Sequence, residues 1–408
     1  MTEPDRETPD RAINWQRNVW IVWLAVFMTG VAFSEILPFM PLYIDTLGHF
    51  SKSELTFYSG AAFAINFLVT AVVSPIWGKV ADKKGRKLMM MRAALGLAIS
   101  LFLMGFAQNV FELLALRALQ GALGGFVSNA NALIATQTPK EKVGRSLGII
   151  VTGFTGGQLI GPLFGGAMAS IVSYQTLFHI TGLILLIVFF FIWFLVEERP
   201  VAAGKEENPV AKVTWKTLPK KSLLVSLFLT TMLIQTVNMS INPIVSLFVR
   251  EVLHNHGSVT FIAGIVAAMP GLATVIFAPV FGRLGDKIGT KYLIQAGFVM
   301  AVFAFVPTAF VTSVIALILL RFAVGISDST MLPAIQTLLT KNSPAGMVSR
   351  VFSYNQSFQA VGSVMGPMLG AAIANVFDYR AIFIVSAGII AINGLLFFFN
   401  VNRKYDLN

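Results

Sequence analysis

The chain has 408 residues, of which 56% are hydrophobic and 12% are charged, and its formal net charge is +11. A soluble domain carries roughly 25% charged residues, so this composition excludes a protein whose whole surface faces water. The sequence has no cysteine, which excludes a disulfide framework, thiolate chemistry and a cysteine metal site.

Windows of about 20 residues predict twelve apolar spans along the chain. The first six lie near 19–43, 55–80, 88–107, 110–137, 144–170 and 176–196. The second six lie near 222–250, 259–283, 291–312, 314–339, 349–376 and 380–401. Continuous apolar runs, in place of the alternation that barrel strands need, indicate helices. We therefore expect an all-α membrane protein whose first apolar run is a span and not a cleaved signal peptide.

The two halves of the chain repeat one another at a spacing of about 204 positions. Pro75, Gly78, Asp82, Gly85 and Lys87 recur as Pro279, Gly282, Asp286, Gly289 and Lys291. Repeats of this length are typical of secondary transporters, whose substrate site lies between the repeats. The repeat predicts two pseudo-symmetric six-helix bundles, residues 1–196 and 222–408, joined by a polar linker over 197–221.

The basic residues predict the orientation in the membrane. If both termini are cytoplasmic, 25 of the 30 lysines and arginines fall in inside segments and three fall outside. This bias is the one that inside loops of membrane proteins carry. The positive charge is therefore interpreted as a topology signal of a multi-pass bacterial inner-membrane protein. A nucleic-acid-binding patch, the competing interpretation, is not expected.

A charged motif lies between the second and third predicted spans and consists of Gly78, Asp82, Gly85, Arg86 and Lys87. The string resembles the loop signature of the major facilitator superfamily, G-x-x-x-D-x-x-G-R-K, and the resemblance covers nearly the whole chain. It implies the major facilitator fold and a cytoplasmic gate in which Asp82 bonds arginines and a helix N-terminus of the opposite half. The alternative is a basic cluster that only fixes topology.

Three further residues belong to the gate that this resemblance implies. Arg145 follows the fourth predicted span, and the second half supplies Asp286 and Arg350. The second copy of the motif departs from the family pattern, because Thr290 stands in place of its arginine.

Arg117 lies within the fourth predicted span, in a string similar to a second family signature, R-x-x-x-G. It sits roughly 12 Å into the membrane, where a guanidinium needs a carboxylate or a carbonyl partner. We predict Glu35 as that partner, because Glu112, five residues away, does not share the helical face of Arg117. The resemblance implies a role in proton coupling; the alternative is an arginine that bonds backbone carbonyls.

The fifth span carries glycines at steps of four, a spacing that stacks them on one helix face. The string consists of Gly153, Gly157, Gly161, Pro162, Gly165 and Gly166. It resembles the signature that marks antiporters within the superfamily, which favours export. The alternative is a plain packing seam. The eleventh span repeats the pattern with Gly362, Gly366, Pro367 and Gly370.

Acidic residues inside the spans are candidate proton carriers. Glu35 and Asp328 lie deepest, and Glu112 lies nearer the outer end of its span. Pro38 and Pro41 follow Glu35 and should interrupt the first helix. We predict that Glu35 and Asp328 face a central cleft and couple protons together with Arg117 and Glu112. The alternative is a set of ion pairs that never titrates.

Polar residues in the predicted spans are candidates for binding substrate beside the two deep acids. They are Asn66, Asn129, Gln158, Gln235, Asn238, Asn242, Gln336, Asn355 and Gln359, with Glu35 and Asp328. The run from Gln235 to Pro243 places several polar side chains beside a proline, as expected of an interrupted helix at a site.

The resemblance is to the twelve-span drug:proton antiporters, and it implies export of hydrophobic compounds, cationic ones included. The expected partners are a small hydrophobic substrate, the proton and membrane lipids, with no nucleic acid and with the chain as a monomer. We expect no enzyme activity, cofactor or metal, and no ATP drive, because no phosphate-binding loop is present. One alternative is a transporter of a single metabolite, sugar or lipid; another is a sensor or scaffold that transports nothing.

Overall fold

The computed structural model describes residues 14–198, 220–254, 257–343 and 348–402. All regular structure within these ranges is helical, and twelve of the helical segments are long and apolar enough to cross a membrane. Both observations confirm the all-α class and the predicted number of spans. Most of the predicted linker lies outside the described residues.

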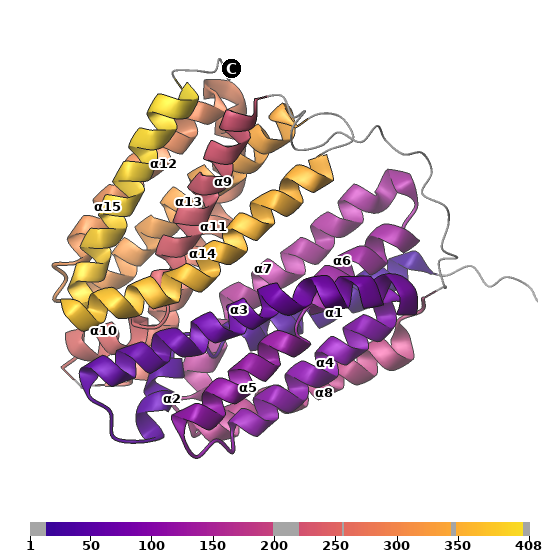
Figure 1. Ribbon diagram of the computed structural model, residues 1–408, viewed down its shortest axis with the longest axis horizontal. Coiled ribbons are helices and arrows are strands. Elements are labelled where there is room, and N and C mark those ends of the chain that lie inside the picture. Colours follow the sequence, from indigo (N-terminus) through magenta and orange to yellow (C-terminus); the bar gives the residue numbers. More distant parts are fainter. Residues whose placement is uncertain (1–13, 199–219, 255–256, 344–347, 403–408) are drawn as a thin grey trace, which may run out of the picture.

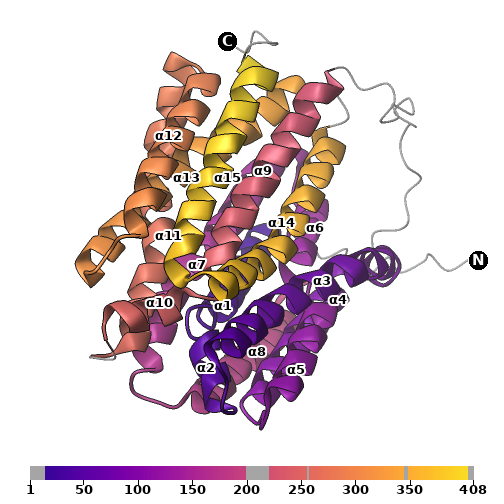
Figure 2. The same cartoon turned by 60° about the vertical axis from the view of Figure 1, so that its left-hand side comes forward.

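Two bundles of helices lie side by side (Figures 1 and 2). The first contains α1 (Trp15–Ser34), α2 (Met40–Thr46), α3 (Lys52–Lys84), α4 (Arg86–Met104), α5 (Val110–Leu123), α6 (Phe126–Gln137), a 3₁₀ turn (Lys140–Lys142), α7 (Val143–Met168) and α8 (Tyr174–Leu195). The second contains α9 (Lys221–Ile241), α10 (Val245–Val252), α11 (Val259–Ile288), α12 (Thr290–Thr308), α13 (Val314–Asn342), α14 (Val348–Val376), α15 (Tyr379–Phe397) and a π turn (Phe398–Asn402).

The molecule has two distinct ends, which we name from the chain path. At the linker end, α8 finishes and α9 begins; at the far end lie the short helices α2 and α10 (Figures 1 and 2). At the linker end the bundles separate: among the described residues, a Cβ added at Gly78, Gly144, Gly148 or Gly282 would have no atom within 4 Å apart from its own helix backbone and chain neighbours.

The bundles touch through two equivalent contacts nearer the far end. In one, Gly60 of α3 packs on Pro367 of α14, so that a Cβ at Gly60 would lie 2.8 Å from the Pro367 carbonyl oxygen. In the other, Gly264 of α11 packs on Pro162 of α7 in the same manner. The internal repeat relates these two contacts, so the bundles meet about a pseudo-two-fold axis.

Three predicted spans are divided into two helices each. The first and seventh divide where the prolines predicted an interruption, at Pro38 and at Pro243, because a proline ring cannot continue the helical hydrogen bonding. The fourth span divides between α5 and α6 without a proline, which the sequence did not predict. Here Gly125 has φ of +95°, a conformation that glycine adopts readily.

Candidate functional site

Asp328 lies near the middle of α13 and is partly exposed, while its neighbours Ser327 and Ser329 are buried. The side-chain amide of Asn238 on α9 donates a hydrogen bond to Oδ2 of Asp328 over 3.1 Å. Leu332 follows at a step of four on the same helical face and is also partly exposed. The structure therefore shows one neutral hydrogen-bond donor on this carboxylate, in a residue that is partly exposed.

Two polar groups near Asp328 lack partners among the described residues. Arg321 lies two turns earlier on α13 and is buried, and its Nε has no hydrogen-bond partner there. Gln336 lies two turns later, and its Oε1 is buried without a partner as well. A buried polar group without a hydrogen bond lowers the stability of the fold. Nε of Arg321 can therefore donate one further hydrogen bond, and Oε1 of Gln336 can accept one.

Arg117 is buried in the first bundle, and its bonds correct the predicted partner. Its Nε donates to the carbonyl oxygen of Ala62 over 3.0 Å, and its Nη1 donates to Oε1 of Gln120 over 2.6 Å. The guanidinium also lies 5.7 Å from the ring centroid of Phe63. These bonds match the carbonyl-bonding alternative; the prediction that Glu35 pairs with Arg117 was wrong.

Glu35 is fully buried within the first bundle. The hydroxyl of Thr181 on α8 donates a hydrogen bond to Oε1 of Glu35, and Oε2 has no partner among the described residues. Gly165 of α7 packs directly on the Glu35 backbone and Cβ. The prediction that Glu35 faces a central cleft was wrong, because α1 ends at Ser34 and the break that follows leaves the carboxyl between α7 and α8.

Glu112 is exposed at the far end, where it caps the start of α5. Its carboxylate accepts hydrogen bonds from the backbone N–H of Gln108 over 2.9 Å and from the side chain of Asn109 over 2.7 Å. A carboxylate at a helix N-terminus is a common stabilising cap. The structure therefore gives Glu112 a structural role, and its role in proton coupling stays a prediction.

A cavity of about 190 Å³ lies in the first bundle beside the division between α5 and α6. Four phenylalanine rings and several uncharged polar groups line it, and no charged side chain does so. The rings are those of Phe33, Phe67, Phe126 and Phe154, and the polar groups include Asn66, Thr70, Gln120 and Ser128. Such a cavity can accept an aromatic ring and offer it hydrogen bonds.

The polar wall of this cavity is held by Asn66 and Gln120. The Asn66 amide donates to Oε1 of Gln120 over 3.3 Å and to the carbonyl oxygen of Arg117 over 3.2 Å. The predicted substrate residue Asn66 therefore lines a cavity, and Gln120 is a central residue that the sequence reasoning missed. Its place one residue before Gly121 in the R-x-x-x-G string could have revealed it.

The division between α5 and α6 frees carbonyl oxygens, and three side chains from α3 and α4 bond them. Thr70 donates to Gly121 over 3.1 Å, Trp77 to Ala122 over 2.7 Å and Arg92 to Gly124 over 2.6 Å. Freed carbonyls inside a membrane protein need such donors. The division is therefore a supported feature of the fold at the edge of the cavity.

The other predicted substrate residues divide into bonded and exposed groups. Asn129 donates to Gly125, Gln235 donates to Ser363, Asn242 donates to the sulfur of Met239, and Asn355 accepts from Thr231. Asn355 is only 2% exposed in this conformation, and its contact with substrate stays a prediction. Gln158 is exposed, and Gln359 is partly exposed.

The glycines of the predicted antiporter motif pack against two different bundles. Gly153, Gly157, Gly161 and Gly165 face α1, whereas Pro162 and Gly166 face Gly264 of the second bundle. Gly362, Gly366 and Gly370 of α14 face α9 in the equivalent way. The motif is a packing seam inside each bundle and, on its other side, part of the contact between bundles.

The charged loop motif bonds within its own bundle in this conformation. Gly85, with φ of +93°, separates α3 from α4. The backbone N–H groups of Arg86 and Lys87 donate to the Glu198 carboxylate over 2.7 and 2.8 Å. Arg145 is exposed. The side chains of the other predicted gate residues, Asp82, Asp286 and Arg350, lie outside the described parts, so the gate stays a prediction for the conformation that closes the linker end.

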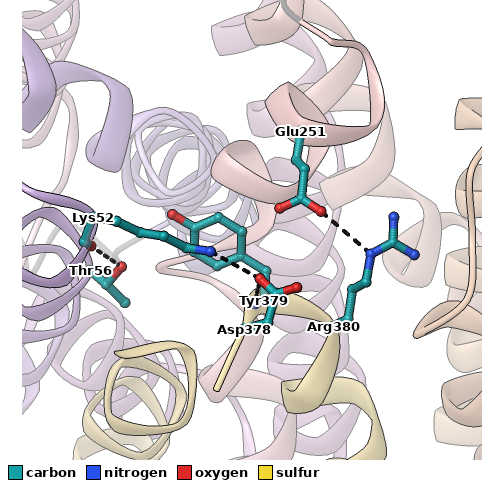
Figure 3. A network of polar contacts seen from close by, with 6 residues as sticks. All are labelled: Lys52, Thr56, Glu251, Asp378, Tyr379 and Arg380. Carbon is teal, nitrogen blue, oxygen red and sulfur yellow. Dashed lines mark hydrogen bonds and ion pairs between the residues drawn. The ribbon is translucent and has the colours of Figure 1, made fainter. Parts of the chain in front are cut away.

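Ion pairs join the bundles at the far end. Lys52 Nζ of α3 lies 3.0 Å from Oδ1 of Asp378, which precedes α15 (Figure 3). The same ammonium lies 4.4 Å above the ring of Tyr379. Nη1 of Arg250 on α10 lies 2.6 Å from Oδ2 of Asp45 on α2. We call these two cross-bundle pairs, Lys52–Asp378 and Arg250–Asp45, the far-end ion pairs.

The environment of Asp378 keeps its carboxylate ionised. Partial burial alone would raise the pKa of Asp378. The hydrogen bonds from Lys52 and from the backbone of Tyr379, with the charges of Lys52 and Arg380, outweigh it and hold the pKa below its usual value of 3.8. Arg380 is itself oriented by Glu251, 3.4 Å away (Figure 3).

Two pseudo-symmetric bundles that separate at the linker end, with a fully buried acid in the first and a partly exposed acid in the second, define the class: a twelve-span membrane transporter built for alternating access. The chain belongs to the Major Facilitator Superfamily, whose sequence model matches residues 22–254 and again residues 227–408. The two matches overlap at residues 227–254 and together extend over both halves of the internal repeat.

Curated relatives match along almost the whole chain. The "Multidrug resistance protein MdtG" of Salmonella heidelberg (strain SL476) is 44% identical over 395 residues, which cover 97% of this chain and 98% of the relative. The protein of the same name from Klebsiella pneumoniae (strain 342) is 44% identical over 386 residues, 95% and 94% of the two chains.

Solved structures share the fold at low sequence identity. A bacterial homologue of the human lysosomal transporter Spinster, in an inward-facing and occupied conformation, has a TM-score of 0.79 at 16% identity, covering 95% of this chain and 96% of that one. The nucleoside transporter NupG has a TM-score of 0.76 at 15% identity, covering 97% and 100%.

Proposed function

We propose that this chain is a proton-coupled antiporter that exports hydrophobic drugs or toxic compounds, cationic ones included, across a bacterial inner membrane. The name of the relatives at 44% identity supports multidrug export, and the superfamily membership supports transport. The linker end is the cytoplasmic end in this proposal, because most basic residues lie there. The conformation described above is then open to the cytoplasm.

The observation that carries the proposal is the partly exposed Asp328, held by one hydrogen bond from Asn238. A carboxylate in this position can bind either a proton or the charge of a cationic substrate, but not both at once. Competition for one acid couples the two fluxes in opposite directions. The aromatic part of a substrate fits the Phe-lined cavity of the first bundle.

The proposed cycle moves the bundles about their two glycine contacts, Gly60 on Pro367 and Gly264 on Pro162. Substrate enters from the linker end while Asp328 is ionised. The bundles then rock, the far-end ion pairs separate, and an external proton binds Asp328 as the substrate leaves. Each pH unit supplies roughly 1.4 kcal/mol per proton, and 100 mV adds about 2.3 kcal/mol per charge moved.

The test is dye efflux from proteoliposomes under an imposed pH gradient. We expect uphill ethidium transport by the wild type and none by Asp328→Asn, with some downhill flux left in that variant. Glu141→Gln, which neutralises an exposed carboxylate at the linker end, is the control and should transport normally. Saturable transport of one polar compound, with no response to ethidium-like dyes, would instead establish a transporter of a single metabolite.

A further inference from the structure

A second cavity, of about 540 Å³, lies at the linker end between the first turn of α1 and the first turn of α7. Its lining includes three cationic side chains and two indole rings, and no acidic residue. These are Arg17, Lys142 and Arg145, with Trp15 and Trp20. It is separate from Asp328 and from the Phe-lined cavity.

The local electrostatics favour an anion. Both α1 and α7 begin at this cavity, and neither has an acidic residue in its first turn. The start of α7 has no side-chain cap. Helix N-termini carry a partial positive charge and unbonded N–H groups. Among the described residues, no carboxylate pairs with Arg17, Lys142 or Arg145, so three cations and two helix ends share one concave surface.

The depth of the cavity matches the lipid headgroups. Trp15 and Val143 are the first residues of their spans, and tryptophan concentrates at the membrane–water interface. Trp20 is 60% exposed one turn further into the span, where it can contact the start of an acyl chain. The positive-inside rule would account for the three cations, but it does not account for a cavity that two indole rings also line.

We propose that this cavity binds the phosphate-bearing headgroup of an anionic phospholipid, with the acyl chains running along α1 beside Trp20. Arg17, Lys142 and Arg145 bind the phosphate, since basic pockets between spans on the cytoplasmic side are suited to anionic headgroups. The inference rests on the proposed cytoplasmic orientation of the linker end, but its test does not involve transport. A bound lipid bridges α1 and α7 and stabilises the first bundle.

The first test measures lipid retention by native mass spectrometry of the detergent-purified full chain, titrated with phosphatidylglycerol, phosphatidylcholine or inorganic phosphate. We expect preferential binding of phosphatidylglycerol. A triple variant, Arg17→Gln with Lys142→Gln and Arg145→Gln, should bind it roughly 100-fold more weakly. The matched control replaces Arg283, Lys287 and Lys341, exposed cations on the second bundle, by glutamine and should bind as the wild type does.

Three results would overturn the proposal: equal retention of phosphatidylglycerol by the triple variant, equal loss in the control variant, or competition by inorganic phosphate at the lipid's own concentration. The last result would assign the cavity to a soluble anion. A second test needs no change of charge. Brominated phosphatidylglycerol should quench tryptophan fluorescence more than brominated phosphatidylcholine does, and Trp20→Phe should remove most of that difference. An unchanged difference would place the lipid elsewhere.

Discussion

The first and second bundles have equivalent contacts between their helices, but their deep acidic residues lie at different positions. In the first, the Thr70 hydroxyl of α3 donates a hydrogen bond to the carbonyl oxygen of Gly121 on α5. In the second, the equivalent Thr274 bonds the carbonyl oxygen of Gly325. The seam glycines are equivalent as well, since Gly165 packs on Glu35 and Gly370 packs on Ser240.

The acids occupy positions that are not equivalent. Glu35 corresponds to Ser240 in the repeat, whereas Asp328 corresponds to Gly124, where the first bundle divides its span. In the first bundle, Glu35 is therefore buried against α8, and a cavity lies at Gly124, the position equivalent to Asp328. The second bundle keeps α13 continuous and presents an acid there. In the proposed function, the first bundle then packs the substrate and the second exchanges the proton.

The largest expected effect separates the two acids. Asp328→Asn should lower pH-driven efflux at least 100-fold, because the exchangeable proton is lost, while Glu35→Gln should stay within about threefold of the wild type, a gap of roughly 2 kcal/mol or more. Initial rates of ethidium efflux from proteoliposomes measure both variants. Equal losses in the two variants would show that the bundles share proton coupling.

The next prediction concerns the buried arginines, whose partners differ because Gln120 of the first bundle corresponds to Val324 of the second. Gln120→Val should lower the free energy of unfolding by about 1–3 kcal/mol, because Arg117 and Asn66 each lose an acceptor. The reverse change, Val324→Gln, offers Arg321 a partner and should not destabilise. Thermal unfolding of purified protein measures both, and a stable Gln120→Val variant would contradict the bonding described.

The equivalence of the helix contacts in the two bundles can be tested at glycines that correspond in the repeat. Gly161→Ala and Gly366→Ala should each lower the free energy of unfolding by about 1–3 kcal/mol. The added Cβ would clash with the backbone of α1 in the first bundle and of α9 in the second. Gly148→Ala is the matched control: nothing lies within 4 Å there, and the change should stabilise the helix by about 0.5–1 kcal/mol. Unequal costs at the two seam positions would break the equivalence.

The smallest effect is expected at the far-end ion pairs. Lys52 and Asp378 have side chains that are 54% and 41% exposed, and exposed pairs contribute about 0.2–1 kcal/mol. Because the pKa of Asp378 is lowered, its contribution is complete above pH 3.8 and is lost only as the pH falls through the lower folded value. Asp378→Asn should lower Tm slightly, and equally at neutral pH and at about pH 5.

A difference between the two pH values, with Asp378→Asn harmless only in acid, would mean that this carboxylate titrates in the range of an acidified exterior. The far-end ion pairs would then sense pH, and the assignment of proton exchange to Asp328 alone would fail.

Apolar runs and prolines made the spans and two of the three interruptions predictable, because burial in lipid and the missing N–H of proline act through local sequence. The division at Gly124 was not predictable, since isolated glycines within an apolar run are also compatible with a continuous helix. It depends on donors from α3 and α4 that lie far away in the sequence.

The placement of the side chain was predictable for Asp328 and not for Glu35. The direction of the Asp328 side chain follows from its place inside one continuous helix. Glu35 lies at the end of α1, where the chain leaves the helical register, so its contact with Thr181, 146 positions away, could not be inferred from spacing. The pairing of Arg117 with Glu35 failed for a related reason, because it assumed that the Glu35 side chain faces the fourth span; the carbonyl alternative was open from the sequence, but it did not identify Ala62.

The most direct test of the account is the count of protons released when substrate binds to the purified transporter in weakly buffered detergent solution near neutral pH. A pH indicator should record release by the wild type and by Glu35→Gln, and no release by Asp328→Asn that still binds substrate. Release that persists in Asp328→Asn, or that disappears in Glu35→Gln, would contradict the assignment of the exchangeable proton to the second bundle.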